Sequence, residues 1–400
     1  MAKQYGRVRS LIRGFAPGLA LSLLTLGAGA CGKGIFSFSS SSSSGGGSTT
    51  TTRSVYVSNF GDGLISSLNL SSAGLRYPLT ISGGAKNGPI GLAVTPKKTA
   101  LYAANAADDL LYEFTLSSNG NLSNLGTIAT GPNPQQPVVT PNGSYAYSVD
   151  ASGSIYEYTV NPTSGLLSAN SPSSTRSGLV DPISAVAANS YLYVTDQNGG
   201  KGVVLIFKIN SSGTLASGPA SVPSLGIPGG PAAPNQLLLL TTTNPTQNWL
   251  FVSDAQSGVI SLFQITNNGS KLTFVNSYAT YATTPNLAEA GLLYVKSNSN
   301  IFIYCADQTN DTVSVFLFTT APLALTRSSV SPSAAALSSP TGLAYAGDNL
   351  YVTNNGNGTI TRFDISTTTA PLGALSNPAS FNTESPANSL SAPEAILITN

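Results

Sequence analysis

The chain has 400 residues, of which 17 are basic, 16 are acidic and none is histidine, so its formal net charge at pH 7 is +1. The absence of clustered Lys and Arg argues against nucleic acid as a partner. The absence of His excludes His-based triads, His zinc sites and most general-base catalysis at neutral pH. The 40 Gly and 25 Pro, together with many β-branched and aromatic residues, predict an all-β protein with many turns.

Residues 1–30 have the pattern of an export signal peptide. Basic residues precede an apolar stretch from Phe15 to Leu26, and small residues at 27–30 lead up to Cys31. Small residues directly before a Cys resemble the lipobox of bacterial lipoproteins, in which that Cys is lipidated. The sequence therefore predicts an exported protein, periplasmic or associated with the outer membrane, with lipid on Cys31 as its contact with a membrane. Ordinary cleavage near Ala30, which would give a secreted protein, and an uncleaved anchor remain alternatives.

Residues 31–53 are expected to form a tether after that lipidated Cys. From Ser37 to Arg53 the sequence is almost entirely Ser, Gly and Thr, which cannot bury enough apolar surface to fold. A flexible segment of this length has an expected reach of about 20–25 Å. The only other cysteine, Cys305, lies within an apolar strand pattern and is expected to be a small core residue.

Residues 54–400 contain a sequence repeat. An aromatic-led apolar run that ends in Asn or Asp occurs seven times, and each copy is followed by a short turn and a second apolar strand. The copies begin at Tyr56, Tyr102, Tyr147, Tyr193, Phe251, Tyr304 and Tyr351. Turns such as the one at 117–120 then lead to a weaker fourth strand. The pattern predicts four strands in each repeat of about 50 residues.

A strand that begins with proline precedes most of the aromatic runs. These strands start at Pro89, Pro134, Pro182, Pro234, Pro285, Pro340 and Pro393. The first aromatic run has no such strand before it, and the strand at Pro393 has no aromatic run after it. In a ring, the C-terminal strand would complete the first blade and leave no long open edge. The sequence therefore predicts a seven-bladed β-propeller of four-stranded antiparallel blades over 54–400, with an open β-solenoid as the alternative.

The repeat resembles that of the lactonase-type seven-bladed propellers, which include the propeller-type 6-phosphogluconolactonases. It also resembles the repeat of surface-layer and NHL-like propellers. Residues 88–96 and 102–122 carry the best match, with a Gly-Pro strand start, a Tyr-led strand and a Ser-x-Gly-x-Leu turn. The resemblance implies that residues after each proline point to the central pocket, where catalytic members of the family place His and Arg. This chain has neither at those positions, so no catalytic residue can be transferred to it.

Strand order would place the proline strand starts and the seven Asn or Asp residues on one face, which is the expected ligand face. Neutral amides after the prolines suit a sugar or peptide ligand, and they could equally hold ordered water. The ligand-binding candidates are Gln135, Gln136, Asn235, Gln236 and Asn286. The Asn and Asp residues that end the aromatic runs are expected chiefly to accept hydrogen bonds from local turn backbone.

Two carboxylates are the candidates for catalysis. Glu394 directly follows Pro393, and Glu289 lies four residues after Pro285. Each is a candidate general acid or base, and each is also readable as a structural carboxylate. The Asp-rich calcium loop pattern and zinc spacings are absent, so no metal site and no cofactor are expected.

The sequence predicts a non-catalytic binding or interaction module, exported and lipid-anchored, for an unidentified small molecule, glycan or protein. The alternative is a lactonase-like hydrolase that acts on a sugar lactone through Glu394 or Glu289 with a bound water or metal.

Overall fold

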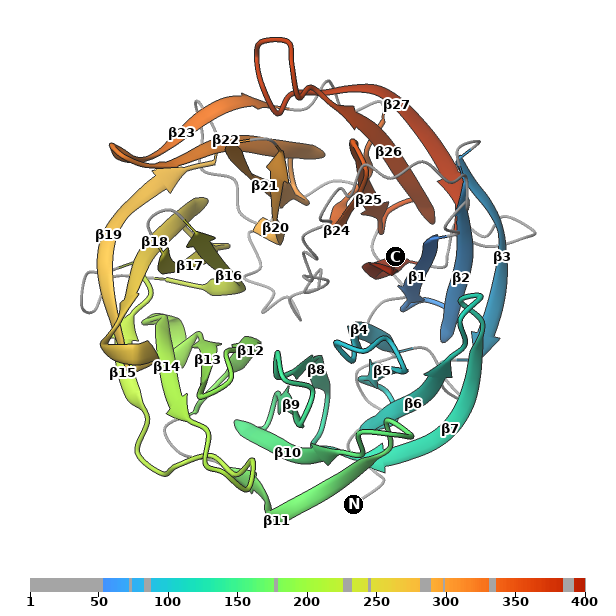
Figure 1. The fold of residues 1–400 in the computed structure, drawn as a ribbon, viewed down its shortest axis with the longest axis vertical. Helices are drawn as coiled ribbons and strands as arrows, with labels where there is room; N and C mark the ends of the chain where they lie inside the picture. The colour runs from blue at the N-terminus through green and yellow to red at the C-terminus, as the bar shows by residue number, and fades with distance from the viewer. Residues whose placement is uncertain are drawn as a thin grey trace, which may run out of the picture. The chain divides into compact units, whose positions relative to one another are not determined.

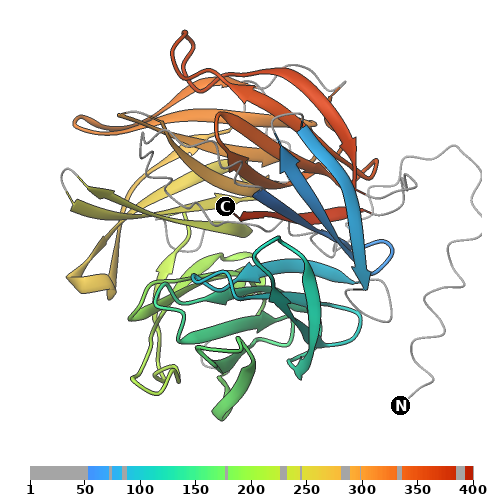
Figure 2. The ribbon, with the colours of Figure 1, turned by 45° about the vertical axis from the view of Figure 1, so that its right-hand side comes forward.

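The computed structural model describes residues 53–71, 74–82, 88–175, 179–225, 232–243, 246–280, 289–297, 299–330, 336–383 and 392–399. All of them belong to one compact unit, Cys31–Asn400. They form seven four-stranded antiparallel sheets arranged as the blades of a ring (Figure 1), which Figure 2 shows turned about its vertical axis. The predicted seven-bladed all-β propeller is confirmed. The predicted signal peptide, Cys31 and the tether up to residue 52 lie outside the described residues.

Four sheets contain the N-terminal part of the chain, and each runs from an inner strand at the centre of the ring to an outer one. The first sheet consists of β28 (Pro393–Thr399), β1 (Arg53–Asn59), β2 (Leu64–Ser71) and β3 (Gly74–Ser82). The second consists of β4 (Pro89–Val94), β5 (Ala100–Asn105), β6 (Leu110–Leu116) and β7 (Leu122–Ala129). The third consists of β8 (Pro134–Val139), β9 (Tyr145–Asp150), β10 (Ser154–Val160) and β11 (Leu167–Thr175). The fourth consists of β12 (Pro182–Ala187), β13 (Tyr191–Asp196), β14 (Val203–Lys208) and β15 (Ala220–Pro223).

The other three sheets follow the same plan. The fifth consists of β16 (Pro234–Thr243), β17 (Thr246–Asp254), β18 (Val259–Thr266) and β19 (Lys271–Ala279). The sixth consists of β20 (Glu289–Ser297), β21 (Asn300–Asp307), β22 (Thr312–Thr320) and β23 (Leu323–Val330). The seventh consists of β24 (Pro340–Ala346), β25 (Asn349–Asn354), β26 (Thr359–Ile365) and β27 (Leu375–Asn382). Helical structure in the described residues is limited to the 3₁₀ turns η2 (Asn198–Gly200) and η3 (Asn267–Gly269), and no helix there is long and apolar enough to cross a membrane.

The C-terminal strand closes the ring. β28 pairs antiparallel with β1, with Ile398 opposite Val55 and Leu397 opposite Tyr56. β28 also contacts the inner strands on both sides of it, β4 and β24. The first blade is thus built from both ends of the propeller, as the phase of the repeats predicts, and neither terminal strand is left as an open edge.

The register defines two faces of the ring. Six inner strands start at a proline that lies opposite the Asn or Asp ending the second strand, as Pro89 lies opposite Asn105 and Pro234 opposite Asp254. We call this side the start face. The inner strands end, and the second strands begin, on the other side, which we call the end face. The predicted placement of the proline starts and the Asn or Asp residues on one face is therefore confirmed for these six blades.

The sixth blade departs from the prediction. Its inner strand β20 begins at Glu289, which lies opposite Asp307 where the other blades have proline. The prediction that Pro285 starts this strand is wrong by four residues, because the register is set by pairs such as Leu292 with Cys305 rather than by the proline. Pro285 itself lies outside the described residues.

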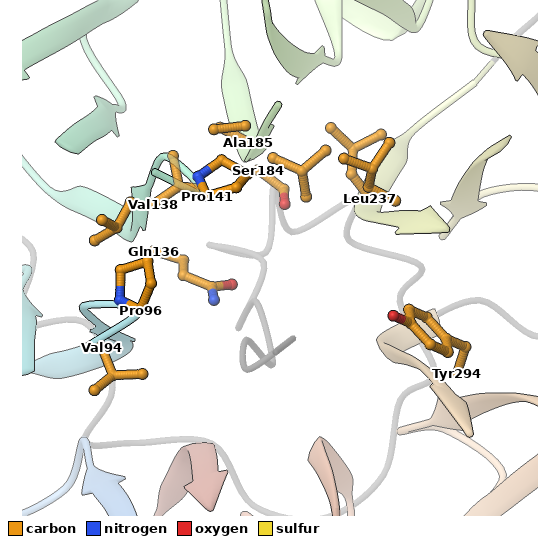
Figure 3. A pocket seen from close by; sticks show the side chains of 13 residues that line it. Val94, Pro96, Gln136, Val138, Pro141, Ser184, Ala185, Leu237 and Tyr294 are labelled. Atoms are coloured by element: carbon orange, nitrogen blue, oxygen red, sulfur yellow. The ribbon is translucent and has the colours of Figure 1, made fainter. Parts of the chain in front are cut away.

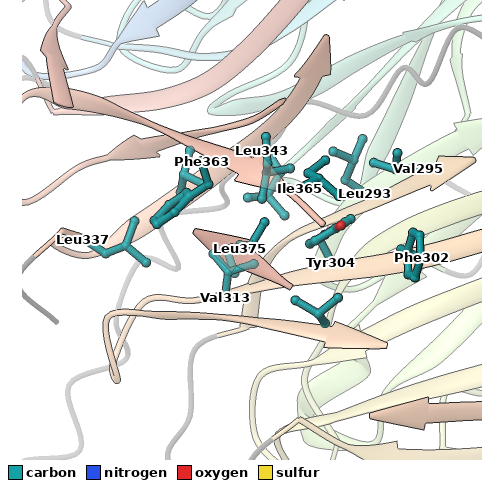
Figure 4. Close-up of a cluster of buried hydrophobic side chains, with 14 residues drawn as sticks. Leu293, Val295, Phe302, Tyr304, Val313, Leu337, Leu343, Phe363, Ile365 and Leu375 are labelled. Atoms are coloured by element: carbon teal, nitrogen blue, oxygen red, sulfur yellow. The ribbon is translucent and has the colours of Figure 1, made fainter. Parts of the chain in front are cut away.

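The hydrophobic core is divided among the gaps between neighbouring blades. Figure 4 shows one such cluster, in which Tyr304 and Val313 of the sixth blade pack with Leu343 and Phe363 of the seventh. Cys305 faces the opposite gap, between the fifth and sixth blades, and is fully buried, as expected for a small core residue. Both sides of most strands are therefore covered by apolar contacts with the neighbouring blades.

A tyrosine hydroxyl links most neighbouring blades. In five blades the aromatic residue of the second strand donates its hydroxyl to the carbonyl of a glycine in an outer turn of the next blade. These pairs are Tyr56 with Gly120, Tyr102 with Gly165, Tyr147 with Gly213, Tyr193 with Gly269 and Tyr304 with Gly373. The link explains why the aromatic run and the Ser-x-Gly-x-Leu turn recur together in the sequence.

Glycine is needed in those turns for two reasons. At Gly165 the backbone has φ of +78°, which side chains rarely adopt, and an added Cβ would lie 2.3 Å from the Cβ of Ala100. The turn can therefore approach the neighbouring blade closely enough for the tyrosine hydroxyl to reach it.

Candidate ligand site in the central channel

A pocket of about 370 Å³ lies among the inner strands at the centre of the ring (Figure 3). Its wall is mostly apolar and includes Val94, Val138, Ala185, Leu237 and Leu239. Because Pro96 and Pro141 also line it, the pocket reaches the end face, where the inner strands stop. Its size is within the range of about 300–1,000 Å³ that is typical of small-molecule sites.

Three polar side chains line this pocket: Gln136, Ser184 and Tyr294. In Figure 3 the amide of Gln136 and the hydroxyl oxygen of Ser184 project toward the open centre, and Tyr294 lies across from them. The amide nitrogen of Gln136 makes a long contact, 3.5 Å, with the carbonyl of Leu92. A few polar groups in an apolar wall fix the orientation of a ligand rather than attract it by charge.

Gln236 stands at the same position on β16 as Gln136 on β8 and Ser184 on β12, two residues after the proline. Its backbone N–H donates to Ser253 Oγ at 3.0 Å. Its side chain is fully buried, yet the amide nitrogen and the amide oxygen have no hydrogen-bond partner within the described part of the chain. An unsatisfied buried amide costs about 1–3 kcal/mol, so this group needs a ligand or an ordered water as its partner.

The other predicted amides have structural surroundings. Gln135 is buried and its amide nitrogen donates to the carbonyl of Asn133 at 3.1 Å. Asn235 is buried, and its backbone carbonyl accepts from Thr195 Oγ1 at 3.1 Å. Neither lines the pocket, and Asn286 lies outside the described residues.

Of the two candidate carboxylates, the structure places the side chain of Glu394 alone. Glu394 is 3% exposed, and its Oε1 accepts a hydrogen bond from Asn355 Nδ2 at 2.6 Å. It thereby supports the turn that follows β25. Glu289 starts β20, but its side chain lies outside what the structure describes. Glu394 is not among the described residues that line the pocket.

The Asn and Asp residues that end the second strands act in the turns. Asp254 Oδ1 accepts from the backbone N–H of Gln256 at 3.1 Å and of Ser257 at 2.8 Å. Burial raises the pKa of the Asp254 carboxyl, and these hydrogen bonds oppose that shift. Asp196 likewise accepts from the backbone of Val180, Asp181 and Asn198. Their buried side chains match the expected turn role.

Sequence reasoning missed Ser184, Tyr294 and the apolar wall of the pocket. Ser184 has the same position as Gln136 and could have been found by aligning the strands. Tyr294 lies five residues after the start of β20, as Leu239 does in β16, but the start of that strand was placed at Pro285. Among the described residues there is no group of three or more His, Cys, Asp or Glu that could hold a metal ion.

Comparisons with known proteins find likeness in structure only. No protein-family model and no curated protein sequence matches the chain. A solved structure from Bacteroides fragilis, whose given name suggests a 6-phosphogluconolactonase, aligns with a TM-score of 0.68 and 16% identity over 89% of this chain and 100% of its own. The periplasmic gluconolactonase of Pseudomonas aeruginosa aligns with a TM-score of 0.67 and 14% identity over 87% of this chain and 99% of its own.

These alignments define the class of protein: a seven-bladed β-propeller. More particularly, the chain has the fold of the 6-phosphogluconolactonase-like propellers, as its repeat resemblance implies. At 14–16% identity the likeness concerns the fold alone.

Proposed function

We propose that the chain binds a small, uncharged molecule of the sugar-lactone class in its central channel. The single observation that carries this proposal is the pair of polar side chains at equivalent strand positions, Gln136 and Ser184, that face the apolar pocket among the described residues. Among the described residues, the pocket wall contains no Lys, Arg, Asp or Glu. Neutral hydroxyl and carbonyl groups are therefore better matched to it than phosphate or carboxylate groups.

Hydrolysis of a lactone in this channel is the second candidate. The comparisons favour it over a non-catalytic module, because two proteins with this fold carry the names of lactonases. The pocket itself supplies only one ionisable side chain, Tyr294. A hydrolase would therefore need a carboxylate from outside the pocket wall, with Glu394 and Glu289 as the candidates, or a bound water or metal.

Calorimetric titration of the purified protein with δ-gluconolactone and with its 6-phospho derivative tests the binding proposal. We expect the neutral lactone to bind more tightly than the phosphorylated one. The Gln136→Ala variant should bind it about tenfold more weakly, which corresponds to the loss of one hydrogen bond. Gln135→Ala is the matched control, because this neighbour is also a buried amide but does not line the pocket. An equal decrease in lactone affinity in the two variants, or no lactone binding by the parent protein, would overturn the proposal.

Lactone turnover above the spontaneous rate is measured in the same samples. Turnover that is lost in Glu394→Gln or Glu289→Gln supports the hydrolase, and absence of turnover in a protein that binds lactone leaves a binding module.

We also propose export and lipid anchoring, which rest on the sequence alone. Mass spectrometry of the mature N-terminus decides this point: a lipidated Cys31 as the first residue supports the anchor, and an unmodified Cys31 contradicts it.

A further inference from the structure

The end face of the propeller carries a cluster of cations. Four lie in or beside the turns that follow inner strands or at the start of a second strand. The other two lie at the ends of outer strands, one at the end of β14 and one at the start of β19. These six residues are Arg53, Lys97, Lys98, Lys208, Lys271 and Lys296. Lys97, Lys208, Lys271 and Lys296 are exposed, and Arg53 and Lys98 are partly exposed. We call these six residues the basic ring.

Few carboxylates oppose the basic ring on this face. Glu113 and Glu157 are buried. The accessible carboxylates near the end face, among the described residues, are Asp348 in the turn between β24 and β25 and Asp364, which lies 3.6 Å from Arg362 and forms an ion pair with it. Lys296 Nζ is held at 2.8 Å from the carbonyl of Thr241 and 5.7 Å from the centre of the Tyr294 ring. Positive charge therefore predominates on this face within the described part of the molecule.

The start face has the opposite composition. Its accessible turns carry Asp62, Asp108, Asp109, Asp181 and Asp311, whereas Lys201 is the cation of the described turns there. The two faces of one ring thus differ in the sign of their charge although the whole chain is nearly neutral. A protein with this distribution orients itself in the field of a charged surface.

The N-terminal segment joins the propeller at the end face, which carries the basic ring. β1 begins at Arg53 and pairs with the end of β28, where Ser54 lies opposite Thr399, so the chain enters the propeller from the end face. Residues 31–52, which include Cys31, are therefore attached to the face that carries the basic ring.

We infer that the basic ring is a docking surface for the anionic phospholipid headgroups of a bilayer. The occupant is a lipid surface, because the cations come from five different blades rather than from one pocket, and because the chain is connected at this face to the segment with Cys31, the proposed site of the anchor. Clustered Lys and Arg are attracted to anionic bilayers within about one Debye length, and each contributes separately. The propeller would thus lie with its end face toward the membrane and its acidic start face toward solvent.

Sedimentation with vesicles tests the inference on the compact unit Cys31–Asn400 carrying Cys31→Ser, so that no lipid anchor contributes. Binding is measured on vesicles of phosphatidylcholine alone and of phosphatidylcholine mixed with phosphatidylglycerol. We expect binding only to the anionic vesicles, and its loss as salt is raised from about 0.05 M to about 0.5 M, where charges are screened. Lys97→Glu should weaken the partition coefficient by about tenfold.

Lys201→Glu is the matched control, since Lys201 is an exposed turn lysine on the start face and the substitution changes the net charge equally. We expect it to leave vesicle binding within about twofold of the parent protein. The inference is overturned if anionic and neutral vesicles bind the protein equally, or if the two substitutions weaken binding to the same extent. The result is independent of lactone binding, because neither lysine lines the central pocket.

Discussion

The tyrosine hydroxyls of the second strands and the amides of Gln136 and Gln236 on the inner strands differ in how they are hydrogen-bonded. On the second strands, tyrosine hydroxyls reach glycine carbonyls of the next blade, as Tyr147 reaches Gly213 at 2.8 Å, and terminal Asp side chains accept several turn N–H groups. On the inner strands, Gln136 has only a long contact to Leu92, and the Gln236 amide has none among the described residues.

The hydrogen-bonded tyrosine and Asp side chains stabilise the propeller, whereas an amide without a partner in the fold is available to a ligand or a water. A buried polar group without a partner is retained only where something outside the fold supplies one, or at a cost in stability. Substitutions on second strands should therefore lower the stability of the fold, whereas substitutions of the inner amides should affect ligand binding and leave the fold as stable or more stable.

The largest effect is expected at Tyr304, which is fully buried between the sixth and seventh blades. Tyr304→Ala should lower the free energy of unfolding by about 3–5 kcal/mol, because it removes a large core side chain and leaves a cavity. Denaturant unfolding followed by circular dichroism measures this change.

Tyr304→Phe is its control, because it keeps the ring and removes only the hydroxyl that donates to the Gly373 carbonyl at 3.0 Å. Burial raises the pKa of the Tyr304 hydroxyl, so the proton that it donates is retained at ordinary pH. We expect the free energy of unfolding to fall by about 1–3 kcal/mol, because the Gly373 carbonyl is left without its partner. A decrease in the free energy of unfolding of less than about 0.3 kcal/mol would show that the hydrogen bond from the Tyr304 hydroxyl does not stabilise the propeller.

The next prediction is an increase in stability rather than a decrease. Gln236→Met keeps the length of the side chain but removes the unsatisfied amide, and it should raise the free energy of unfolding of the ligand-free protein by about 1–3 kcal/mol. Thermal unfolding of the variant and the parent protein measures this change. A variant that is destabilised without ligand would mean that Gln236 is a structural residue like those on the second strands.

Much of the fold was predictable because its determinants repeat. Seven aromatic runs and seven proline-led strands, out of phase by one element, fixed the number of blades and the closure by β28. Even the burial of Cys305 followed from the strand pattern around it. The exception, β20 of the sixth blade, shows the limit of this reasoning: proline marks the start of the inner strand in the other six blades, but strand pairing decides the register in this one.

The site was less predictable, because a pocket is made by residues that are distant in sequence. The amides after the prolines were recognisable as polar positions, yet Gln135 and Gln136 are adjacent in the chain and only Gln136 lines the pocket. The sequence analysis also did not predict that basic and acidic residues lie on opposite faces. The net charge of the chain adds the charges of both faces, so it does not show how they are distributed.

The smallest expected effect is a change of stability with pH. It concerns Glu113, a carboxylate that forms a hydrogen bond between two blades. Glu113 on β6 is buried, and its Oε1 accepts from the backbone N–H of Leu167 in the next blade at 2.6 Å. Burial raises the pKa of the Glu113 carboxyl, and the hydrogen bond from Leu167 only partly opposes this. The folded protein therefore binds a proton more tightly than the unfolded chain does.

The contribution of Glu113 to stability is consequently full below the ordinary carboxyl pKa of about 4.3 and is lost as the pH rises through the raised folded value. Glu113→Gln keeps the acceptor oxygen but removes the titration. Its melting temperature relative to the parent protein should thus increase as the pH is raised from about 4 to 7. Asp348→Asn, at an exposed carboxylate on the end face, is the control and should show no such trend. A relative melting temperature of Glu113→Gln that falls with rising pH would mean that the hydrogen bond from Leu167 outweighs burial, and that this inter-blade contact is stabilised by the charge rather than in spite of it.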